Sequence, residues 1–307
     1  MQRRLSVLVL LLLFLSSICL GITPTDRNVL LKRNNPIVQS FDSLATLSIG
    51  NGEFAMSVDP TGLQTFPMLY AKDNLLITQA EWLDRHLGVI GFEFPSTTTI
   101  EDFADITQTL VLNSGIIKTN YTLQGNAISI YTVCHPERDL VAAHIISELP
   151  IPIKLCFPYI TKGALSWGNY PKHSTRLVSK RDNAMVFKRS IDRLVYYVVL
   201  QWQGNVSIVE KLDNYYVVTP DKGHFAFSCE FVPHFTTTFD GIVLPTFKET
   251  AEKSATAWGT YWSSDCIKTL SDSTHLYTRI EEQRLILECY KNFVSGNKKS
   301  EETFLSE

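Results

Sequence analysis

The sequence carries little charge, and nothing in its balance of charges suits a nucleic-acid binder. Asp, Glu, Lys and Arg make up 19% of its 307 residues, and 28 basic side chains against 31 acidic ones give a formal charge of −3. A chain that holds nucleic acid needs a basic surface to neutralise phosphates. Disorder is excluded too, because 45% of the residues are hydrophobic and 17 Phe and 12 Tyr are available for a core.

The common catalytic and cofactor motifs are also missing. No phosphate loop ends in Gly-Lys-Ser/Thr, and no Gly-x-Ser-x-Gly presents a nucleophilic serine. The segment Gly50-Asn51-Gly52-Glu53-Phe54-Ala55 approaches a dinucleotide-binding pattern, but strand-like residues follow it where that pattern requires a helix. No two of the seven histidines have the spacing of metal ligands on a helix, and His144 reads as a sheet residue rather than a base. We therefore expect no metal and no cofactor.

Long hydrophobic runs are absent outside the first residues. Residues 5–15 are apolar and follow Arg3 and Arg4, but this run is shorter than the roughly 20 residues of a membrane span. Residues 1–21 are predicted to be a signal peptide, cleaved after Cys19 or Gly21, with an uncleaved anchor as the alternative. The exported body is expected to be soluble, without a stable membrane span, and either secreted or periplasmic.

Cysteine is too sparse for a disulfide scaffold. The five cysteines that follow the signal peptide are odd in number and widely spaced, so we favour buried, unpaired thiols over a single bridge. They are Cys134, Cys156, Cys229, Cys266 and Cys289.

What the sequence does contain is a series of short β-rich runs between turn residues. The residues from 127 to 134 alternate, so that Ile128 and Ile130 share one face of a strand while Ser129 and Tyr131 share the other. Further runs cover 140–146, 194–202, 206–218 and 225–232. Asn51-Gly52 and Asp59-Pro60-Thr61-Gly62 are typical of turns. The fold class predicted for 22–244 is mainly β, a large antiparallel β-sandwich or supersandwich.

Two C-terminal helices are predicted after Pro245. Thr246 and Glu249 form a capping box, and the helix from 246 to 263 presents Trp258 and Trp262 on its apolar face. A second helix should begin near Ser273 or Thr274 and end around Gly296. Its predicted apolar residues are Leu276, Ile280, Leu287, Tyr290 and Phe293, and its predicted outward residues are Glu281, Glu282, Arg284 and Lys291. We expect the apolar faces of both helices to need partners beyond this chain unless they fold back on the sandwich.

Two segments could bind sugar. In Glu81-Trp82-Leu83-Asp84 the indole could stack on a sugar ring while a carboxylate accepts hydroxyl hydrogen bonds, although a surface turn with a half-buried Trp is the simpler interpretation. A basic run faces only Asp182 and Asp192. It reads as a solvated loop, and a site for an anionic polysaccharide is the alternative. Its members are Lys172, Arg176, Lys180, Arg181, Lys188, Arg189 and Arg193.

Several segments in the right order resemble the N-terminal part of secreted six-hairpin glycosidases, the relatives of trehalase and of maltose-phosphorylase-like enzymes. They extend over nearly the whole chain after the signal peptide. They are Arg33-Asn34-Asn35-Pro36, Leu47-Ser48-Ile49-Gly50-Asn51-Gly52-Glu53-Phe54-Ala55, Thr61-Gly62-Leu63-Gln64-Thr65-Phe66-Pro67, Thr78-Gln79-Ala80-Glu81-Trp82, Trp258-Gly259-Thr260-Tyr261-Trp262-Ser263-Ser264 and the stretch 279–290.

The resemblance implies a β-supersandwich, a helical linker over 245–272 and, over 273–307, the first helix of an (α/α)6 barrel. In the family, barrel loops hold two carboxyl groups that cleave glycosidic bonds with inversion, or phosphate replaces the water. It also implies substrate contacts for Gln79, Glu81 and Trp82, and a place near the cleft for Glu302. None of these is expected to be a catalytic residue.

The sequence departs from the family because about eleven barrel helices are missing and Phe304 stands where relatives carry glycine. We therefore expect a truncated or split domain of a glycoside hydrolase for oligo- or polysaccharides, inactive alone, whose barrel could come from a separate chain. The alternative is a secreted carbohydrate-binding or structural module.

Overall fold

The computed structural model describes residues 27–42, 45–70, 77–79, 87–161, 164–166, 173–234, 241–263 and 279–296. The predicted signal peptide at 1–21 lies outside these residues. Among the helices in the described part of the chain, none is long and apolar enough to cross a membrane.

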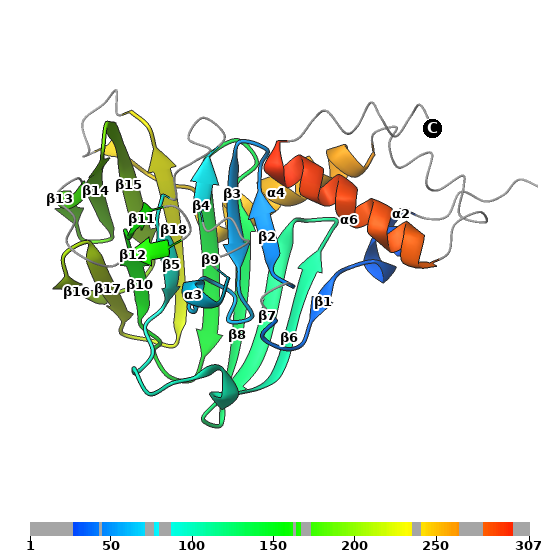
Figure 1. Ribbon diagram of the computed structural model, residues 1–307, viewed down its shortest axis with the longest axis horizontal. Coiled ribbons are helices and arrows are strands. Elements are labelled where there is room, and N and C mark those ends of the chain that lie inside the picture. The colour runs from blue at the N-terminus through cyan, green and yellow to red at the C-terminus, as the bar shows by residue number, and fades with distance from the viewer. Residues whose placement is uncertain are drawn as a thin grey trace, which may run out of the picture.

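One antiparallel sheet of nine strands runs through the molecule (Figure 1). Alternation builds it as predicted: Ile128, Ile130 and Cys134 are buried, whereas Ser129 and Tyr131 on the other face are half-buried. In spatial order the strands are β1 (Ile37–Val38), β6 (Phe103–Val111), β7 (Ile116–Leu123), β8 (Asn126–Cys134), β9 (Leu140–Ser147), β18 (His224–Val232), β15 (Leu194–Trp202), β14 (Ala184–Ile191) and β13 (His173–Arg181).

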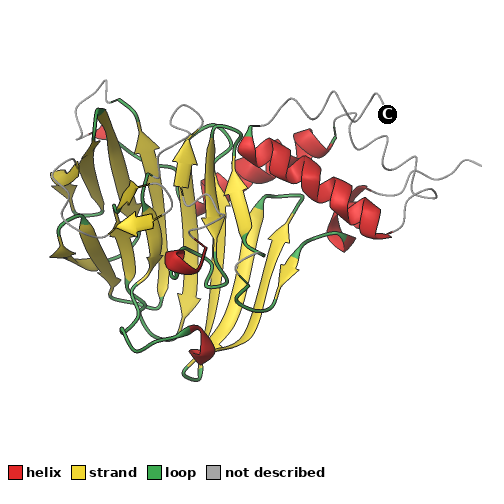
Figure 2. Cartoon of the chain, in the orientation of Figure 1, coloured by secondary structure: helices red, strands yellow, loops and turns green. Residues whose placement is uncertain are grey.

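Smaller sheets complete the sandwich (Figure 2). One contains β16 (Val206–Leu212), β17 (Tyr215–Pro220), β10 (Ile153–Cys156) and β5 (Val89–Phe92). Another contains β2 (Leu47–Gly50), β3 (Phe54–Val58) and β4 (Ile77–Gln79), and a third pairs β11 (Tyr159–Thr161) with β12 (Ala164–Ser166). Rings close the space between layers: the Phe54 ring on β3 lies 5.7 Å from that of Phe231 on β18, and the Phe187 ring on β14 lies 4.6 Å from that of Tyr216 on β17. The predicted sandwich is confirmed.

Two local predictions differ from the structure in an informative way. The β-rich run at 206–218 is divided into β16 and β17, because Asn214 adopts a left-handed φ of 65° and turns the chain. The basic run is not a solvated loop, since most of it forms the paired strands β13 and β14. Side chains that alternate across a strand can place a charge on the buried face, which a count of charges does not reveal.

The cysteines behave as small hydrophobic side chains. Cys134, Cys156 and Cys229 are buried and unpaired, and Cys289 is unpaired and half-buried. Burial raises the pKa of the Cys156 thiol to about 12, so this group stays protonated and unreactive at neutral pH. Cys266 lies outside the described residues.

Helix α4 (Phe247–Trp262) begins with the predicted capping box, in which the Thr246 hydroxyl accepts a hydrogen bond from the Glu249 amide and the Glu249 carboxylate accepts one from the Thr246 amide. Its first turns cover the outer face of the large sheet, where Phe247 lies 5.6 Å from the ring of His144. The other helical segments are α2 (Arg27–Arg33), α3 (Pro67–Tyr70), η2 (Ile100–Asp102) and α6 (Arg279–Ser295).

The aromatic residues of α4 and α6 fold back on the sandwich. Trp258, Trp262 and Tyr290 are 4%, 2% and 2% exposed, so the expectation that these faces lack partners within the chain is wrong. The Trp258 ring stacks 4.7 Å from that of Tyr290, and the Trp262 indole donates to the carbonyl of Leu112 at 2.6 Å. The turn between β6 and β7 makes this packing possible, because Gly115 has no side chain to displace Trp258.

The predicted face of α6 also needs correction. Glu282, expected to point outward, is 7% exposed, whereas Ile280, expected on the apolar face, is 79% exposed. The buried stripe is Glu282, Ile286, Tyr290 and Val294. The acid can be buried because α2 brings Arg33 to its carboxylate and the amide of Asn34 donates to it at 2.5 Å. The predicted helix end is confirmed, with Gly296 at φ 68°.

Replacement of Gly115 tests the seat of Trp258. A Cβ at Gly115 would lie 2.0 Å from the indole nitrogen of Trp258, at a φ of 64°. We expect Gly115→Ala to lower the free energy of unfolding by about 2–4 kcal/mol, since overpacking adds to left-handed strain. Gly125→Ala is the control, because its φ is 82° but nothing lies within 4 Å, and strain alone should cost about 1 kcal/mol. Urea unfolding followed by tryptophan fluorescence measures both, and equal losses would contradict the proposed role of Gly115.

Replacement of Glu282 tests the link between α2 and α6. Burial by itself would raise the pKa of Glu282, but hydrogen bonds from Arg33 and Asn34 and the charges of Arg33 and Arg279 outweigh it and lower the pKa below 4.5. Glu282→Gln should cost about 1–3 kcal/mol at neutral pH, at the low end for a buried pair because Arg33 is partly exposed. A carboxylate with a lowered folded-state pKa stabilises above its unfolded pKa, so the difference between variant and parent should shrink as the pH falls below about 4.5.

Glu252→Gln is the control for that experiment. Glu252 is exposed on α4 and its nearest cation is Lys248 at 3.9 Å, so its replacement should change the free energy of unfolding by about 0.5 kcal/mol or less. A loss for Glu282→Gln that stayed constant from pH 7 to pH 3 would show that the ionised carboxylate is not what stabilises α6.

Candidate functional site

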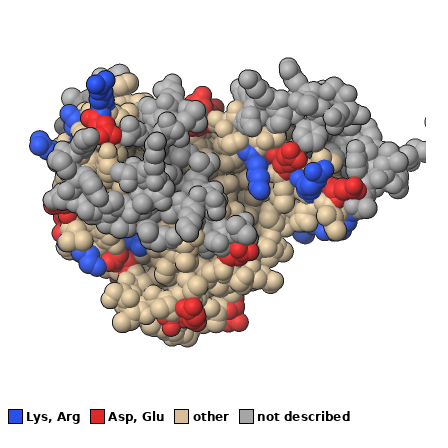
Figure 3. Space-filling model, viewed as in Figure 1, with Lys and Arg blue, Asp and Glu red and all other residues tan. Residues whose placement is uncertain are grey.

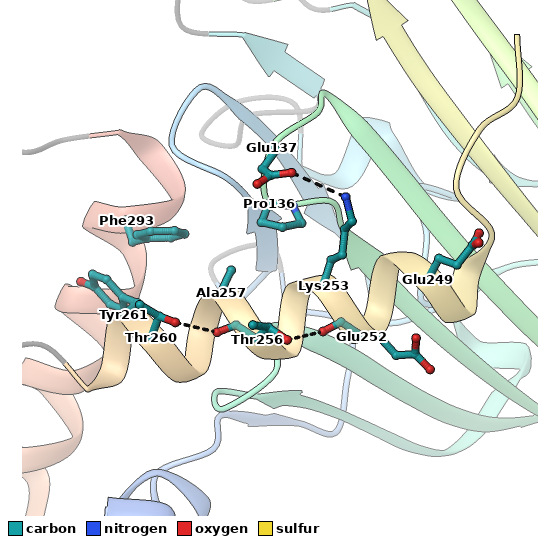
Figure 4. A pocket seen from close by; sticks show the side chains of 10 residues that line it. All are labelled: Pro136, Glu137, Glu249, Glu252, Lys253, Thr256, Ala257, Thr260, Tyr261 and Phe293. Atoms are coloured by element: carbon teal, nitrogen blue, oxygen red, sulfur yellow. Dashed lines mark hydrogen bonds and ion pairs between the residues drawn. The ribbon is translucent and has the colours of Figure 1, made fainter.

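A groove of about 740 Å³ lies where α4, α6 and the turn between β8 and β9 meet (Figure 4). It is the largest hollow that the described residues line. Its walls come from three parts of the chain that are far apart in sequence. They are Pro136, Glu137, Glu249, Glu252, Lys253, Thr256, Ala257, Thr260, Tyr261 and Phe293.

One end of the groove has an apolar floor. Tyr261 of α4 and Phe293 of α6 lie with ring centroids 4.6 Å apart, and Ala257 is half-buried one turn before Tyr261 (Figure 4). The Tyr261 hydroxyl donates to the carbonyl of Cys289 at 3.0 Å, which fixes the two helices relative to each other. A half-buried aromatic and aliphatic floor of this kind suits a side chain or a sugar ring that stacks on it.

The rim of the groove is charged and exposed. Lys253 lies 3.6 Å from the carboxylate of Glu137, across the gap between α4 and the β8–β9 turn (Figure 4). Glu249 closes the capping box, and hydrogen bonds from the backbone and side chain of Thr246 lower its pKa. Ion pairs at this exposure add little stability, so the rim is free to exchange its partners for those of a ligand.

The groove is poorly equipped for acid–base chemistry. Glycosidic bond cleavage needs one carboxyl group that stays protonated near neutral pH, and burial is what raises a carboxyl pKa that far. Glu137, Glu249 and Glu252 are all exposed. Asp59 does have a raised pKa, because it is buried, but the Thr61 hydroxyl and the amides of Thr61 and Phe66 enclose it in a turn. A substrate cannot reach that carboxyl group.

The sugar-contact residues predicted from the sequence fall largely outside the described residues. Glu81, Trp82 and Glu302 lie there entirely. Gln79 is the last residue of β4, where its backbone pairs opposite Phe54 at the end of β3 next to the Gly50–Gly52 turn; the structure does not describe its side chain. The segment with Glu81 and Trp82 follows directly, so their role stays a prediction.

The groove residues were missed in the sequence because no local signal joins them. The capping box identifies Glu249, and the three- and four-residue spacing identifies the buried tryptophans, but neither identifies the exposed side of α4 as a wall. Glu137 follows the Cys134-His135 pair that was considered for a metal. Within the described residues, no three His, Cys, Asp or Glu side chains gather as metal ligands would.

Comparisons with known proteins give a fold likeness and no assignment. No family model matches the chain, and no curated protein matches it. A structure described as kojibiose phosphorylase, from the human microbiome, is 9% identical over 82% of this chain and 34% of its own, with a TM-score of 0.41. A bacterial glucoamylase complexed with acarbose is 12% identical over 74% and 38%, with a TM-score of 0.48.

A family GH92 α-mannosidase from Bacteroides thetaiotaomicron is 10% identical over 74% of this chain and 33% of its own, with a TM-score of 0.32. The chain thus spans 33–38% of the length of these three structures. Their names agree with the group of enzymes that the sequence motifs resemble. At such identities and scores, the likeness assigns neither substrate nor reaction.

Proposed function

We propose that this chain is the non-catalytic β-sandwich domain of a six-hairpin-type glycoside hydrolase, which takes part in carbohydrate breakdown and does not cleave glycosides by itself. The observation that carries the proposal is the groove along α4 and α6, with its apolar floor and its exposed, charged rim. Such a surface can bind a partner or a sugar, whereas it lacks a carboxyl group that would remain protonated to act as the acid.

The motifs that resemble the family support this assignment through their positions. Arg33 and Asn34 bind Glu282 of α6, and the Gly50–Gly52 turn lies against the end of the same helix. Trp258 of α4 stacks on Tyr290. Segments from both ends of the described chain therefore build one rigid junction of two helices and a sandwich. A junction of this kind is suited to hold a further helical domain in a fixed orientation.

The groove is the proposed contact surface for that helical domain, which supplies the catalytic carboxyl groups in cis or from another chain. Ala257, Tyr261 and Phe293 would receive apolar side chains of its first helices, and the excess of Glu over Lys on the rim favours a partner with basic residues there. Gln79, Glu81, Trp82 and Glu302 are proposed to contact the oligo- or polysaccharide, and residues 1–21 to direct the protein out of the cytoplasm.

Activity measurements on the chain from residue 22 to 307 test the proposal. Alone, it should release no sugar above the blank from α- and β-linked disaccharides, starch or mannan, with water or with phosphate as acceptor. Mixed with a separately produced (α/α)6 barrel from the same genome that has no sandwich of its own, it should give turnover that neither part shows. Robust turnover by the chain alone would overturn the proposal.

Two variants of α4 locate the contact. Ala257→Arg fills the groove with a charged side chain and should abolish turnover of the mixture, with tryptophan fluorescence of the isolated chain unchanged. Gly259→Arg is the matched control, because Gly259 is exposed on α4, has nothing within 4 Å and does not line the groove. If the chain instead bound glycans on an array, lost this on Trp82→Ala and never supported turnover, it would be the carbohydrate-binding module of the alternative.

A further inference from the structure

The basic hairpin β13–β14 contains a buried arginine. Arg189 on β14 is 1% exposed, although Arg176 and Lys180 on the neighbouring strand are exposed. Strand alternation turns Arg189 toward the space between the large sheet and the β16–β17–β10–β5 sheet, where its guanidinium lies 5.8 Å from the centroid of the Phe157 ring. Its position differs from that of the other basic side chains, which line the edge of the sheet in Figure 3.

The charge of Arg189 is surrounded by neutral acceptors. One terminal nitrogen donates to the Thr175 hydroxyl at 3.3 Å and to the amide oxygen of Asn214 at 3.2 Å. The other lies 3.4 Å from the carbonyl of Pro158 and 2.7 Å from Nδ1 of His173. Three of these four contacts are long for a hydrogen bond to a charged donor. No carboxylate of the described residues forms an ion pair with Arg189.

A buried cation without a counter-charge is unfavourable. Removing a charge from water costs several kcal/mol in effective terms, and neutral acceptors recover part of that cost. Burial lowers the pKa of Arg189, but a guanidinium stays charged at any physiological pH. The site therefore has an unmet demand for negative charge.

A small enclosed cleft of about 30 Å³ adjoins the guanidinium. Three partners of Arg189 form part of its walls, namely Pro158, His173 and Asn214, together with Phe157 below and Leu212 at the 66% exposed rim. Asp213 also lines the cleft without forming an ion pair to Arg189. A volume of this size accepts about two water-sized groups, so it fits the charged end of a ligand and not a sugar ring.

We propose that this cleft binds a small anionic group, a carboxylate or a sulfate. Its negative charge would lie against the Arg189 fork and replace the long bond to Asn214, whose amide nitrogen can donate to the same group. Arg176, Lys180 and Arg193 are exposed on or beside this hairpin and attract anions toward it. The chemistry is shared by acidic sugars, such as uronates, and by free inorganic sulfate. The inference does not depend on the proposed function.

A pair of rim variants tests the cleft without disturbing the buried arginine. The melting temperature of the chain is measured with sodium sulfate, sodium glucuronate or glucose, with sodium chloride keeping the ionic strength constant. Sulfate and glucuronate at millimolar concentrations should each raise it by about 2–4 °C, as saturating ligand does, and glucose should not. Leu212→Glu supplies a carboxylate at the exposed rim and should abolish the shift, whereas Leu212→Gln, its neutral match, should keep it.

The outcomes separate the possible sources and can overturn the inference. A calorimetric Kd at least tenfold tighter for glucuronate than for sulfate identifies an acidic sugar as the ligand, and the reverse identifies the inorganic ion. A sulfate effect that persists in Leu212→Glu would be the general salting effect of sulfate and would overturn the site. So would the absence of a shift with both anions. Arg189→Lys should weaken binding at least tenfold, and Arg176→Ala, on the exposed face, should leave the Kd within about twofold.

Discussion

The contact between Trp258 and Gly115 is the constraint on which the arrangement of helices and sheets depends. A turn with a left-handed glycine leaves room for the indole, and Tyr290 then closes over it from α6. The indole of Trp262 reaches the carbonyl of Leu112 at the end of β6, next to the same turn. Because protein interiors tolerate neither voids nor overlap, one missing side chain in this turn determines where α4 can lie and, through Tyr290, where α6 can lie.

Helix α6 is in turn held from three directions. Arg33 and Asn34 bind its first turns through Glu282, the Tyr290 hydroxyl donates to the carbonyl of Ser48 at 2.8 Å, and its last residues lie against the Gly50–Gly52 turn. A Cβ at Gly50 would lie 2.8 Å from the Val294 side chain, so glycine is needed there for packing as well as for the turn. The groove inherits its shape from this junction, since both of its apolar walls belong to α4 and α6.

The two candidate binding places differ in physical character. The groove offers apolar area with exposed charges that water already screens, so it suits a large partner whose own side chains complete it. The cleft beside Arg189 offers a desolvated cation in a space of a few atoms, where a single negative group makes most of the difference. A sandwich can carry both because the groove lies along the helices, on one side of the large sheet's turns, and the cleft lies near the far edge strands β13 and β14.

The sequence alone was sufficient for the elements whose cause is local. Alternation at 127–134, the Asn51-Gly52 turn and the Thr246–Glu249 capping box predicted strands, a hairpin and a helix start that the structure contains, because each depends on residues within one or two turns of chain. The tertiary structure decided what depends on distant partners. Glu282 is buried because Arg33, 249 residues away, neutralises it, and Arg189 is buried because its strand faces a second sheet. The groove likewise exists because Glu137, Lys253 and Phe293 meet in space, and pattern and composition carry no information about which distant segments pack together.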